Sequence, residues 1–219
     1  MYHLIKGLKK DFVQPLYNMP KIEVYSAITN GKDNPRNDIK VFSDYNKFVS
    51  PVFNAKIYKI LPHKYLDCDI SVWVDGNMLL KVPKEQLVAE CLGEADLAVF
   101  HHNHSPHMDW EMKWIKYVWR SRDRKVYEEA IRQVEHYKAL GVADTAKMAM
   151  CGMLIRRHTP MMARFNEAWW AEICRWGQRD QLSFPIVLSQ FPEIKVNYIT
   201  QNVKNNSYMY YEPHKQFVT

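Results

Sequence analysis

The stretch that decides the fold is Asp67 to Leu80, DCDISVWVDGNMLL. Its centre, Ile70 to Val74, consists mainly of β-branched and aromatic residues and predicts a buried β-strand. The strand leads directly into Asp75-Gly76-Asn77, so we expect Asp75 at the carboxyl end of a strand. In open α/β sheets ligands bind outside those ends, where a carboxylate can hold a hard cation or a sugar hydroxyl. Asp-Gly is also an ordinary turn dipeptide, and the stretch alone permits both interpretations.

Length and composition fit one α/β domain covering residues 1–219. The chain is 47% hydrophobic and 25% charged, which is enough for one sizeable core. We expect about 20 N-terminal and about 15 C-terminal residues to be peripheral. No apolar run is long enough for a membrane helix, and the first residues lack the apolar centre of a signal peptide, so the simplest expected location is the cytoplasm.

Charge and cysteine content narrow the function only slightly. The formal charge of +6 and the pI near 9.0 suit anionic ligands such as nucleotides, glycans or nucleic acid. Lysine and arginine are spread along the chain, however, and favour no single partner. The four cysteines form no close pair, which predicts reduced thiols and neither a zinc knuckle nor a redox motif.

The N-terminal part has the order strand, polar loop, strand, which is typical of the opening of a nucleotide-binding α/β domain. The strands are expected at 21–29 and 39–42, followed by a helix over 53–63. Lys56, Lys59 and His63 are three and four residues apart, so they share one face of that helix. This face is either solvated or a clamp on a diphosphate.

A histidine cluster follows the next predicted strand. The pattern predicts a helix over 84–93 and a buried strand over 96–100, which leads into His101, His102, His104 and His107. Four histidines in seven residues could bind zinc and form a histidine-centred metallohydrolase. The segment is broken by a proline and contains no helical pair at i, i+4. The alternatives are hydrogen bonding to a sugar or phosphate, and a solvated loop.

Aromatic residues then recur at helical intervals from 109 to 119: Trp110, Trp114, Tyr117 and Trp119. We interpret them as a core stripe in preference to a stacking platform. A helix is expected to end before Gly141, and residues 149–155 predict another buried strand. Gly152 in the middle of that strand indicates a bulge or a close approach to the backbone.

The last third carries two further acids. Apolar residues spaced three and four apart predict a helix over 160–176, and Glu172 falls on its apolar face. Asp180 precedes a predicted helix over 182–191. It is either the N-cap of that helix or one of two carboxylates that share a pocket with each other. In the second interpretation the pair is Glu172 and Asp180. One carboxylate accepts a proton from an attacking hydroxyl, and the other orients that hydroxyl.

Several segments carry a resemblance to a known family: SVWVDGNM at 71–78, CGMLIRRH at 151–158 and, above all, WWAEICRWGQRDQLSFPIVL at 169–188. Over about residues 21–191 the chain resembles the glycosyltransferase-like family of bacterial polysaccharide clusters and plant Golgi proteins. The resemblance implies an α/β fold of the GT-A (Rossmann-like) type, a single nucleotide-sugar-binding domain with a central mixed sheet flanked by helices. It also implies a divalent cation, Mn²⁺ or Mg²⁺, bound by an Asp-x-Asp-like motif.

The resemblance also assigns roles to individual residues. Asp75 would be the principal metal or ribose ligand, with Asn77 in place of the second acid and His214 completing the cation site. Asp180 would be the acid that faces the acceptor, and together with Glu172, its partner in the pocket inferred above from the residues, it is expected to be catalytic. The donor would be bound by Tyr25 and Asp33 near the nucleoside, by Lys56, Lys59 and His63 near the diphosphate, and by Gly152 beside the sugar. Acceptor or sugar binding is expected of His102, His104, Arg179 and Gln181.

The expected reaction is sugar transfer from a nucleotide sugar, a UDP-sugar by family habit, to a hydroxyl of a surface polysaccharide or another glycan. If the reaction inverts the anomeric carbon, Asp180 is expected to be the base; if it retains, Asp180 orients donor or acceptor. Hydroxymethylated bases of DNA are an alternative acceptor, which predicts binding that weakens steeply with salt. The histidine metallohydrolase and a non-catalytic, tryptophan-based glycan-binding module are hypotheses of other classes.

Overall fold

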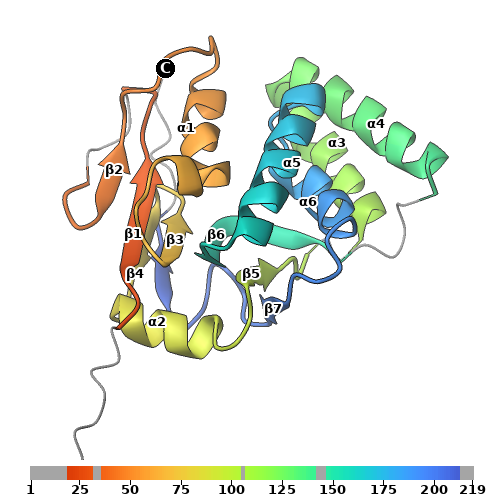
Figure 1. Ribbon diagram of the computed structural model, residues 1–219. Coiled ribbons are helices and arrows are strands. Elements are labelled where there is room, and N and C mark those ends of the chain that lie inside the picture. Colours follow the sequence, from red (N-terminus) through yellow and green to blue (C-terminus); the bar gives the residue numbers. More distant parts are fainter. Residues whose placement is uncertain (1–18, 32–35, 105–106, 142–146, 213–219) are drawn as a thin grey trace, which may run out of the picture.

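A six-stranded mixed sheet in the order β2-β1-β3-β6-β5-β7 forms the centre of the computed structural model, which describes residues 19–31, 36–104, 107–141 and 147–212 (Figure 1). The strands are β1 (Ile22–Ala27), β2 (Lys40–Phe42), β3 (Ile70–Val74), β5 (Leu97–His101), β6 (Ala149–Arg157) and β7 (Val196–Ile199). Strand β6 runs antiparallel to its neighbours β3 and β5, and the other pairs are parallel. The carboxyl ends of five strands and the amino end of β6 therefore meet at one edge of the sheet.

Helices cover both faces of the sheet. One face carries α1 (Pro51–Ile60), α5 (Pro160–Trp176) and α6 (Asp180–Leu188) on a shared apolar core. The other carries α2 (Lys84–Cys91) and a small sheet of β4 (Met78–Leu80) and β8 (Met209–Tyr211). The hairpin of α3 (Met108–Arg122) and α4 (Arg124–Ala139) packs on α6 through a third core, and α4 lies at the right of Figure 1. The expected α/β fold with a central mixed sheet flanked by helices is confirmed.

The predicted strand over 70–74 is confirmed without change and is buried along its whole length. The helix predicted over 53–63 instead begins at Pro51 and ends at Ile60, because Pro62 starts a separate 3₁₀ turn, η1 (Pro62–Lys64). The helix predicted over 182–191 begins earlier, at Asp180, and ends at Leu188. The first of these changes matters for the site, since it separates His63 from the helix that carries Lys56 and Lys59.

The predicted aromatic core stripe on α3 is wrong for three of its four residues, whereas Trp119 is partly buried and packs against the third core. Trp110 is 53% exposed, Trp114 is 52% exposed and Tyr117 is 81% exposed. The buried residues of α3 are instead Met108, Glu111 and Ile115. The three exposed aromatic residues and the three buried residues both have helical spacing, so the helix turns the first set outward and buries the second.

Gly152 lies in a bulge of β6, as its position in the sequence predicted. Val99 of β5 pairs with Leu154, but the next residue, Phe100, pairs with Met150, so β6 has extra residues at this point. A Cβ atom on residue 152 would come within 2.9 Å of Met78 Cε and 3.4 Å of Asp75 Oδ2. The predicted bulge and close approach are both confirmed, and the group that approaches includes the Asp75 carboxylate.

Candidate functional site

The carboxyl edge of the sheet brings together polar segments that are far apart in the sequence. Asp75 follows β3, His102 to His104 follow β5, and Asn202 to Lys204 lie shortly after β7. Parallel strands end at the same edge, so these loops lie beside one another. The backbone links them: Asp75 N donates to Gly152 O at 2.8 Å, and His102 N donates to Met148 O at 3.1 Å, which ties the β3 and β5 ends to β6.

Two lysines of α1 and two aspartates form a cluster at this edge. Lys56 Nζ lies 2.7 Å and Lys59 Nζ 2.9 Å from Asp180 Oδ2 at the start of α6. Lys59 Nζ is also 3.4 Å from Asp75 Oδ1. The two lysine side chains are only 12% and 6% exposed, so the solvated-face interpretation is wrong for them. We call Lys56, Lys59, Asp75 and Asp180 the lysine–aspartate cluster.

Electrostatics favour the charged forms of Asp180 and Lys59. Burial alone would raise the pKa of Asp180, but Lys56 and Lys59 outweigh burial and hold that pKa well below its usual value. Burial lowers the pKa of Lys59, yet the charges of Asp180 and Asp75 outweigh it and raise the pKa. Burial lowers the pKa of Lys56, whose attraction to Asp180 does not fully compensate. The difference follows from the second carboxylate near Lys59, and Asp180 is ionised at neutral pH.

Asp75 is the exposed member of the cluster. Its side chain is 43% exposed, and Oδ1 accepts a hydrogen bond from Trp73 Nε1 at 2.8 Å. Asn77 turns away from it: the amide of Asn77 donates to the Glu212 carbonyl at 3.0 Å, and Glu212 N donates to Asn77 O at 2.9 Å. Asn77 therefore ties the turn after β3 to the segment after β8 and does not complete an Asp-x-Asp pair beside Asp75.

The residues seen here do not complete a cation site. Within 19–31, 36–104, 107–141 and 147–212 no group of three His, Cys, Asp or Glu side chains is placed to share a metal ion. The exposed carboxylate of Asp75 already faces an ammonium group at 3.4 Å. His214 and Asp33, the other expected ligands of cation and nucleoside, lie outside the described residues.

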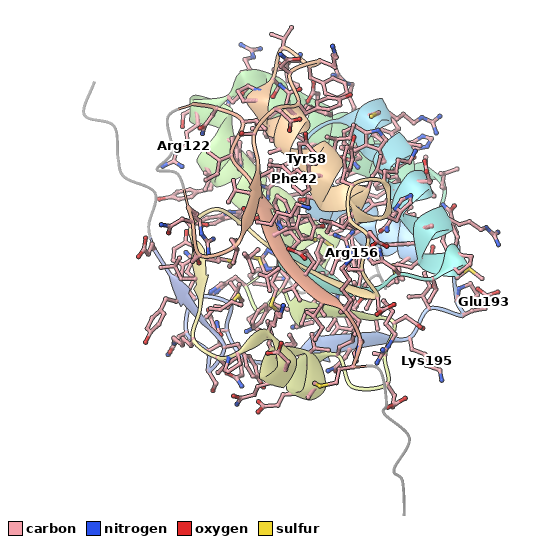
Figure 2. All side chains as sticks on the ribbon, turned by 60° about the vertical axis from the view of Figure 1, so that its left-hand side comes forward. Phe42, Tyr58, Arg122, Arg156, Glu193 and Lys195 are labelled. Atoms are coloured by element: carbon pink, nitrogen blue, oxygen red, sulfur yellow. The ribbon has the colours of Figure 1, made fainter. Side chains whose placement is uncertain are left out.

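Two residues expected at the donor lie elsewhere. Tyr25 is fully buried, and its hydroxyl accepts from Arg156 Nη2 at 3.0 Å and donates to the Tyr58 carbonyl at 3.2 Å. Tyr58 in turn stacks on Phe42 with ring centroids 4.4 Å apart (Figure 2). Burial raises the pKa of Tyr25 to about 12. The expectation that Tyr25 contacts a nucleoside is corrected: it is a core residue that orders the carbonyl end of α1.

His63 is the second residue to be placed differently. It lies on η1, with Nε2 3.3 Å from Glu167 Oε1 and Nδ1 3.4 Å from Asn166 Nδ2. Its partners belong to α5, whereas the lysines of α1 face Asp180. The shared basic face predicted from spacing therefore does not include His63, because the chain leaves the α-helical path before Pro62.

Glu172 and Asp180 do not form the expected pair. Glu172 Oε1 accepts from Tyr137 Oη at 2.9 Å and from Trp176 Nε1 at 2.7 Å, so this carboxylate joins α4 to α5. Asp180 is bound by the lysines of α1 instead. The N-cap interpretation of Asp180 is also wrong, because the residue preceding α6 is Arg179 and no side chain caps that helix end.

A cavity of about 710 Å³ opens at the same edge of the sheet. Its wall contains Gln181, the residue after Asp180, but none of the four residues of the cluster, so the two are linked through α6. The four residues expected to bind acceptor or sugar are all brought together in the lining of the cavity: His102, His104, Arg179 and Gln181. Helix α3 contributes Trp110, Lys113, Trp114 and Tyr117 to the lining. The remaining lining residues are His101, Asn103, Met150, Asn202, Val203, Lys204 and Tyr211.

Glu111 supports one wall of this cavity and was missed from the sequence. Its side chain is fully buried; Oε2 lies 3.2 Å from His102 Nε2, and Oε1 pairs with Arg179 Nη2. Arg179 also donates to Gln181 Oε1 at 2.7 Å. Burial raises the pKa of Glu111, but His102 and Arg179 outweigh burial and lower it. Its spacing of three from Met108 and four from Ile115 was the available signal, since it places Glu111 on the buried face.

The histidines do not converge on one point. His101 Nδ1 is 3.3 Å from Asn103 Oδ1, His102 is paired with Glu111, and His104 is exposed. Since the described parts of the chain hold no three-ligand group, the histidine-centred metallohydrolase loses its geometric basis. Hydrogen bonding by individual histidines in the cavity wall remains.

The fold and the site define an α/β domain of the kind that places its ligand site at the carboxyl edge of the sheet. Residues 39–213 match the family model described as TOD1/MUCI70, glycosyltransferase-like domain. The chain therefore belongs to the TOD1/MUCI70 family of glycosyltransferase-like domains, and the resemblance seen in the sequence is confirmed.

Individual relatives are more distant. The chain is 26% identical over 145 residues to a probable hexosyltransferase, MUCI70, of Arabidopsis thaliana; the match covers 61% of this chain and 24% of that protein. The chain thus spans about a quarter of the length of this curated relative.

No helix of the described chain has the length and apolarity to cross a membrane.

Two solved structures are also similar. The galactosyltransferase LgtC, in complex with donor and acceptor sugar analogues, matches with a TM-score of 0.34 and 15% identity, covering 66% of this chain and 44% of that one. Mouse xyloside xylosyltransferase 1 in its apo form matches with a TM-score of 0.40 and 12% identity, covering 74% of this chain and 63% of that one.

Proposed function

We propose that this chain is a GT-A-type glycosyltransferase that moves a sugar from a nucleotide sugar, in the first instance a UDP-sugar, to a hydroxyl of a glycan. The observation that carries the proposal is the lysine–aspartate cluster beside the cavity at the carboxyl edge: Asp180 belongs to the cluster, and Gln181 lines the cavity. Membership of a glycosyltransferase-like family supports this class of reaction.

The lysines supply the charge that the leaving group needs. A departing nucleoside diphosphate gathers negative charge, and preorganised cations near its oxygens lower the energy of the transition state. Lys56 and Lys59 are held at this edge by Asp180 and Asp75, so they are in place before a ligand arrives. A diphosphate entering here would share these ammonium groups with the two carboxylates.

Asp180 is suited to orient a sugar hydroxyl. While both lysines pair with it, its pKa is held well below the usual value, which makes it a weak base. An ionised carboxylate of this kind accepts strong hydrogen bonds from hydroxyl groups. If the lysines turn toward a diphosphate, the pKa of Asp180 rises and its basicity increases. Donor binding would then prepare Asp180 for the acceptor.

Nucleotide binding gives the first test. Thermal unfolding is measured with UDP, GDP, CDP or ADP, each with Mn²⁺, Mg²⁺ or EDTA, for the wild type and for Asp75→Ala and Lys59→Met. A ligand at hundredfold excess over its dissociation constant stabilises the native state by about 2.7 kcal/mol, which raises the melting temperature by several degrees. We expect stabilisation by one nucleotide, which is lost in both variants. Loss of that stabilisation in EDTA would show that a cation takes part in binding, with Asp75 and His214 as the proposed ligands.

Stabilisation by none of the four nucleotides would contradict the proposal. A large stabilisation by Zn²⁺ alone would contradict it as well and would return attention to the histidines after β5. Asp67→Ala is the matched control for Asp75→Ala, because Asp67 is a fully exposed aspartate that pairs with the exposed Lys21 and lies away from the carboxyl edge. Its response to nucleotides should equal that of the wild type.

A further inference from the structure

The aromatic residues of α3 form an exposed wall in the cavity. Trp110, Trp114 and Tyr117 are each more than half exposed and all line it. They are four and three residues apart, so they extend for about 10 Å along one face of the helix. The rings of Trp114 and Tyr117 have centroids 6.2 Å apart and planes tilted by 35°. Large exposed apolar patches of this kind mark binding surfaces.

The charge of the cavity is one-sided. Its lining contains no aspartate or glutamate among the described residues. Lys113 and Lys204 are exposed in it and, within the described chain, contact rings in place of carboxylates: Lys113 Nζ lies 4.8 Å from the Trp110 centroid and Lys204 Nζ 5.3 Å from that of Tyr211. Arg179 differs, because the buried Glu111 neutralises it. Two positive charges therefore face the cavity without an acidic partner.

We propose that this cavity is the acceptor subsite and takes an acidic oligosaccharide of at least two sugar rings. The C–H faces of the sugars would pack on Trp110, Trp114 and Tyr117, which removes apolar surface from water. Carboxylates or other anionic groups of the saccharide would pair with Lys113 and Lys204. The aromatic wall is longer than a single sugar ring. The role of this saccharide as acceptor rests on the proposed transferase function, whereas its binding to the cavity does not require a donor.

A second part of the cavity wall, which Glu111 of α3 holds in place, is arranged to direct the saccharide toward the cluster. Glu111 fixes His102 and Arg179, and Arg179 holds Gln181 by its side-chain oxygen. Gln181 follows Asp180 directly in α6. A sugar ring stacked on α3 and hydrogen-bonded near Gln181 would thus have its terminal hydroxyl close to the lysine–aspartate cluster.

The experiment measures binding by isothermal titration calorimetry without nucleotide. The ligands are trisaccharides of a hexuronic acid and of the matching neutral hexose with the same linkage. We expect the acidic ligand to bind about tenfold more tightly at low salt, because two charge pairs each contribute modestly. Trp114→Ala should weaken both ligands by about tenfold through the loss of stacking area. Lys113→Met with Lys204→Met should abolish the preference for the acidic ligand and leave binding of the neutral one.

Matched controls come from the same elements. Lys116 is exposed on α3 and Tyr210 is exposed on β8, and neither lines the cavity. Lys116→Met and Tyr210→Ala should bind both saccharides as the wild type does. Melting temperatures of all variants show that the changes do not reflect unfolding.

Three results would overturn the proposal. One is equal affinity for the acidic and neutral ligands. Another is an unchanged affinity in Trp114→Ala. The third is binding of a DNA oligonucleotide, with the steep salt dependence of phosphate contacts, in place of either saccharide. The nucleotide test separates the two levels: stabilisation by UDP without saccharide binding defeats only the subsite, whereas saccharide binding without nucleotide binding defeats only the transferase reaction.

Discussion

Asp180 shows at the scale of one residue how strongly the site depends on charge balance. Its carboxylate is 9% exposed and has two ammonium groups within 2.9 Å. Buried ions of this kind lose much of their hydration, and close partners compensate for that loss only while all of them are charged. The cluster therefore tolerates removal of one member far less than a surface pair does.

Asp180→Asn should lower the free energy of unfolding by about 3 to 5 kcal/mol, because it removes the carboxylate that Lys56 contacts and leaves Lys59 with the more distant Asp75. Urea denaturation monitored by tryptophan fluorescence measures this. The control is Asp67→Asn, which breaks the exposed pair with Lys21, where the cost should stay below about 1 kcal/mol. Equal effects of the two substitutions would contradict the buried, charged state of the cluster.

The same residue predicts a pH dependence. The pKa of Asp180 is depressed in the folded chain, so its stabilising contribution is complete above the pKa of an unfolded aspartate, near pH 4, and is lost as pH falls through the lower folded value. Wild-type stability should therefore decline more steeply below about pH 4 than that of Asp180→Asn. Urea midpoints measured at several acidic pH values test this, and parallel pH curves for the two proteins would refute it.

Strand β6 is the element through which the fold reaches the site. Its bulge at Gly152 leaves room for Met78 and for the Asp75 carboxylate. Gly152→Ala should push Met78 aside and displace Asp75, costing about 1 kcal/mol or more in stability and weakening nucleotide binding. Thermal shifts with and without UDP measure both effects.

Gly76 offers the control for that substitution. A Cβ atom there would meet Ile28 Cγ1 at 3.7 Å, an ordinary contact. Gly76→Ala should therefore change stability by less than about 0.5 kcal/mol and preserve nucleotide binding. If Gly152→Ala behaved in the same way, the close approach of β6 to Asp75 would have no functional consequence.

Helix α3 depends on Glu111 for its attachment to the sheet edge. Glu111→Gln keeps the shape of the side chain but removes the charge that pairs with His102 and Arg179, so we expect a loss of about 3 kcal/mol in unfolding free energy. Glu128→Gln on α4 is the control, because Glu128 pairs with Arg124 on the helix surface and should matter little. Chemical denaturation compares the two.

The same elements show what a sequence can and cannot reveal. Periodicity correctly predicted that Trp110, Trp114 and Tyr117 share one face, but spacing is identical for an inward and an outward face, so their exposure was not foreseen. Likewise the spacing of Lys56 and Lys59 gave their common direction, whereas their partner Asp180 lies more than a hundred residues away. Local patterns predict which residues share a helical face, but the packing of distant elements decides whether that face is buried and what it contacts.

Across the molecule, the central sheet was the most predictable part. Strands β1, β3, β5 and β6 are runs of mainly apolar residues bounded by turns, and such runs predict buried strands from the sequence alone. Strands β7 and β8 were not predicted, because they are short, partly exposed and separated by an irregular polar segment. The residues after β7 and Tyr211 of β8 line the cavity, so part of its wall could not be anticipated from patterns.

Nucleotide binding should leave a one-sided signature on the whole molecule. All the proposed ligand contacts lie at the carboxyl edge, so hydrogen exchange should slow in the loops at 28–31, 75–77 and 101–104 when UDP is added. The loops of the opposite edge, at 66–69, 93–96 and 192–195, serve as internal controls and should exchange unchanged. Protection spread evenly over both edges would argue against a site at the carboxyl edge.

Strand β6, which runs antiparallel to both of its neighbours, also limits the order in which the sheet can form during synthesis. Strand β6 lies between β3 and β5, yet it is made after both, with α3 and α4 in between. Until residue 157 is available, β3 and β5 each present an unpaired backbone edge, which is the feature that promotes aggregation. A nascent chain that stalls within the α3–α4 hairpin therefore holds a three-stranded sheet, β2-β1-β3, and the single strand β5, because both partners of β5 are made later. Its safe completion depends on helices or chaperones that cover the unpaired edges until β6 arrives.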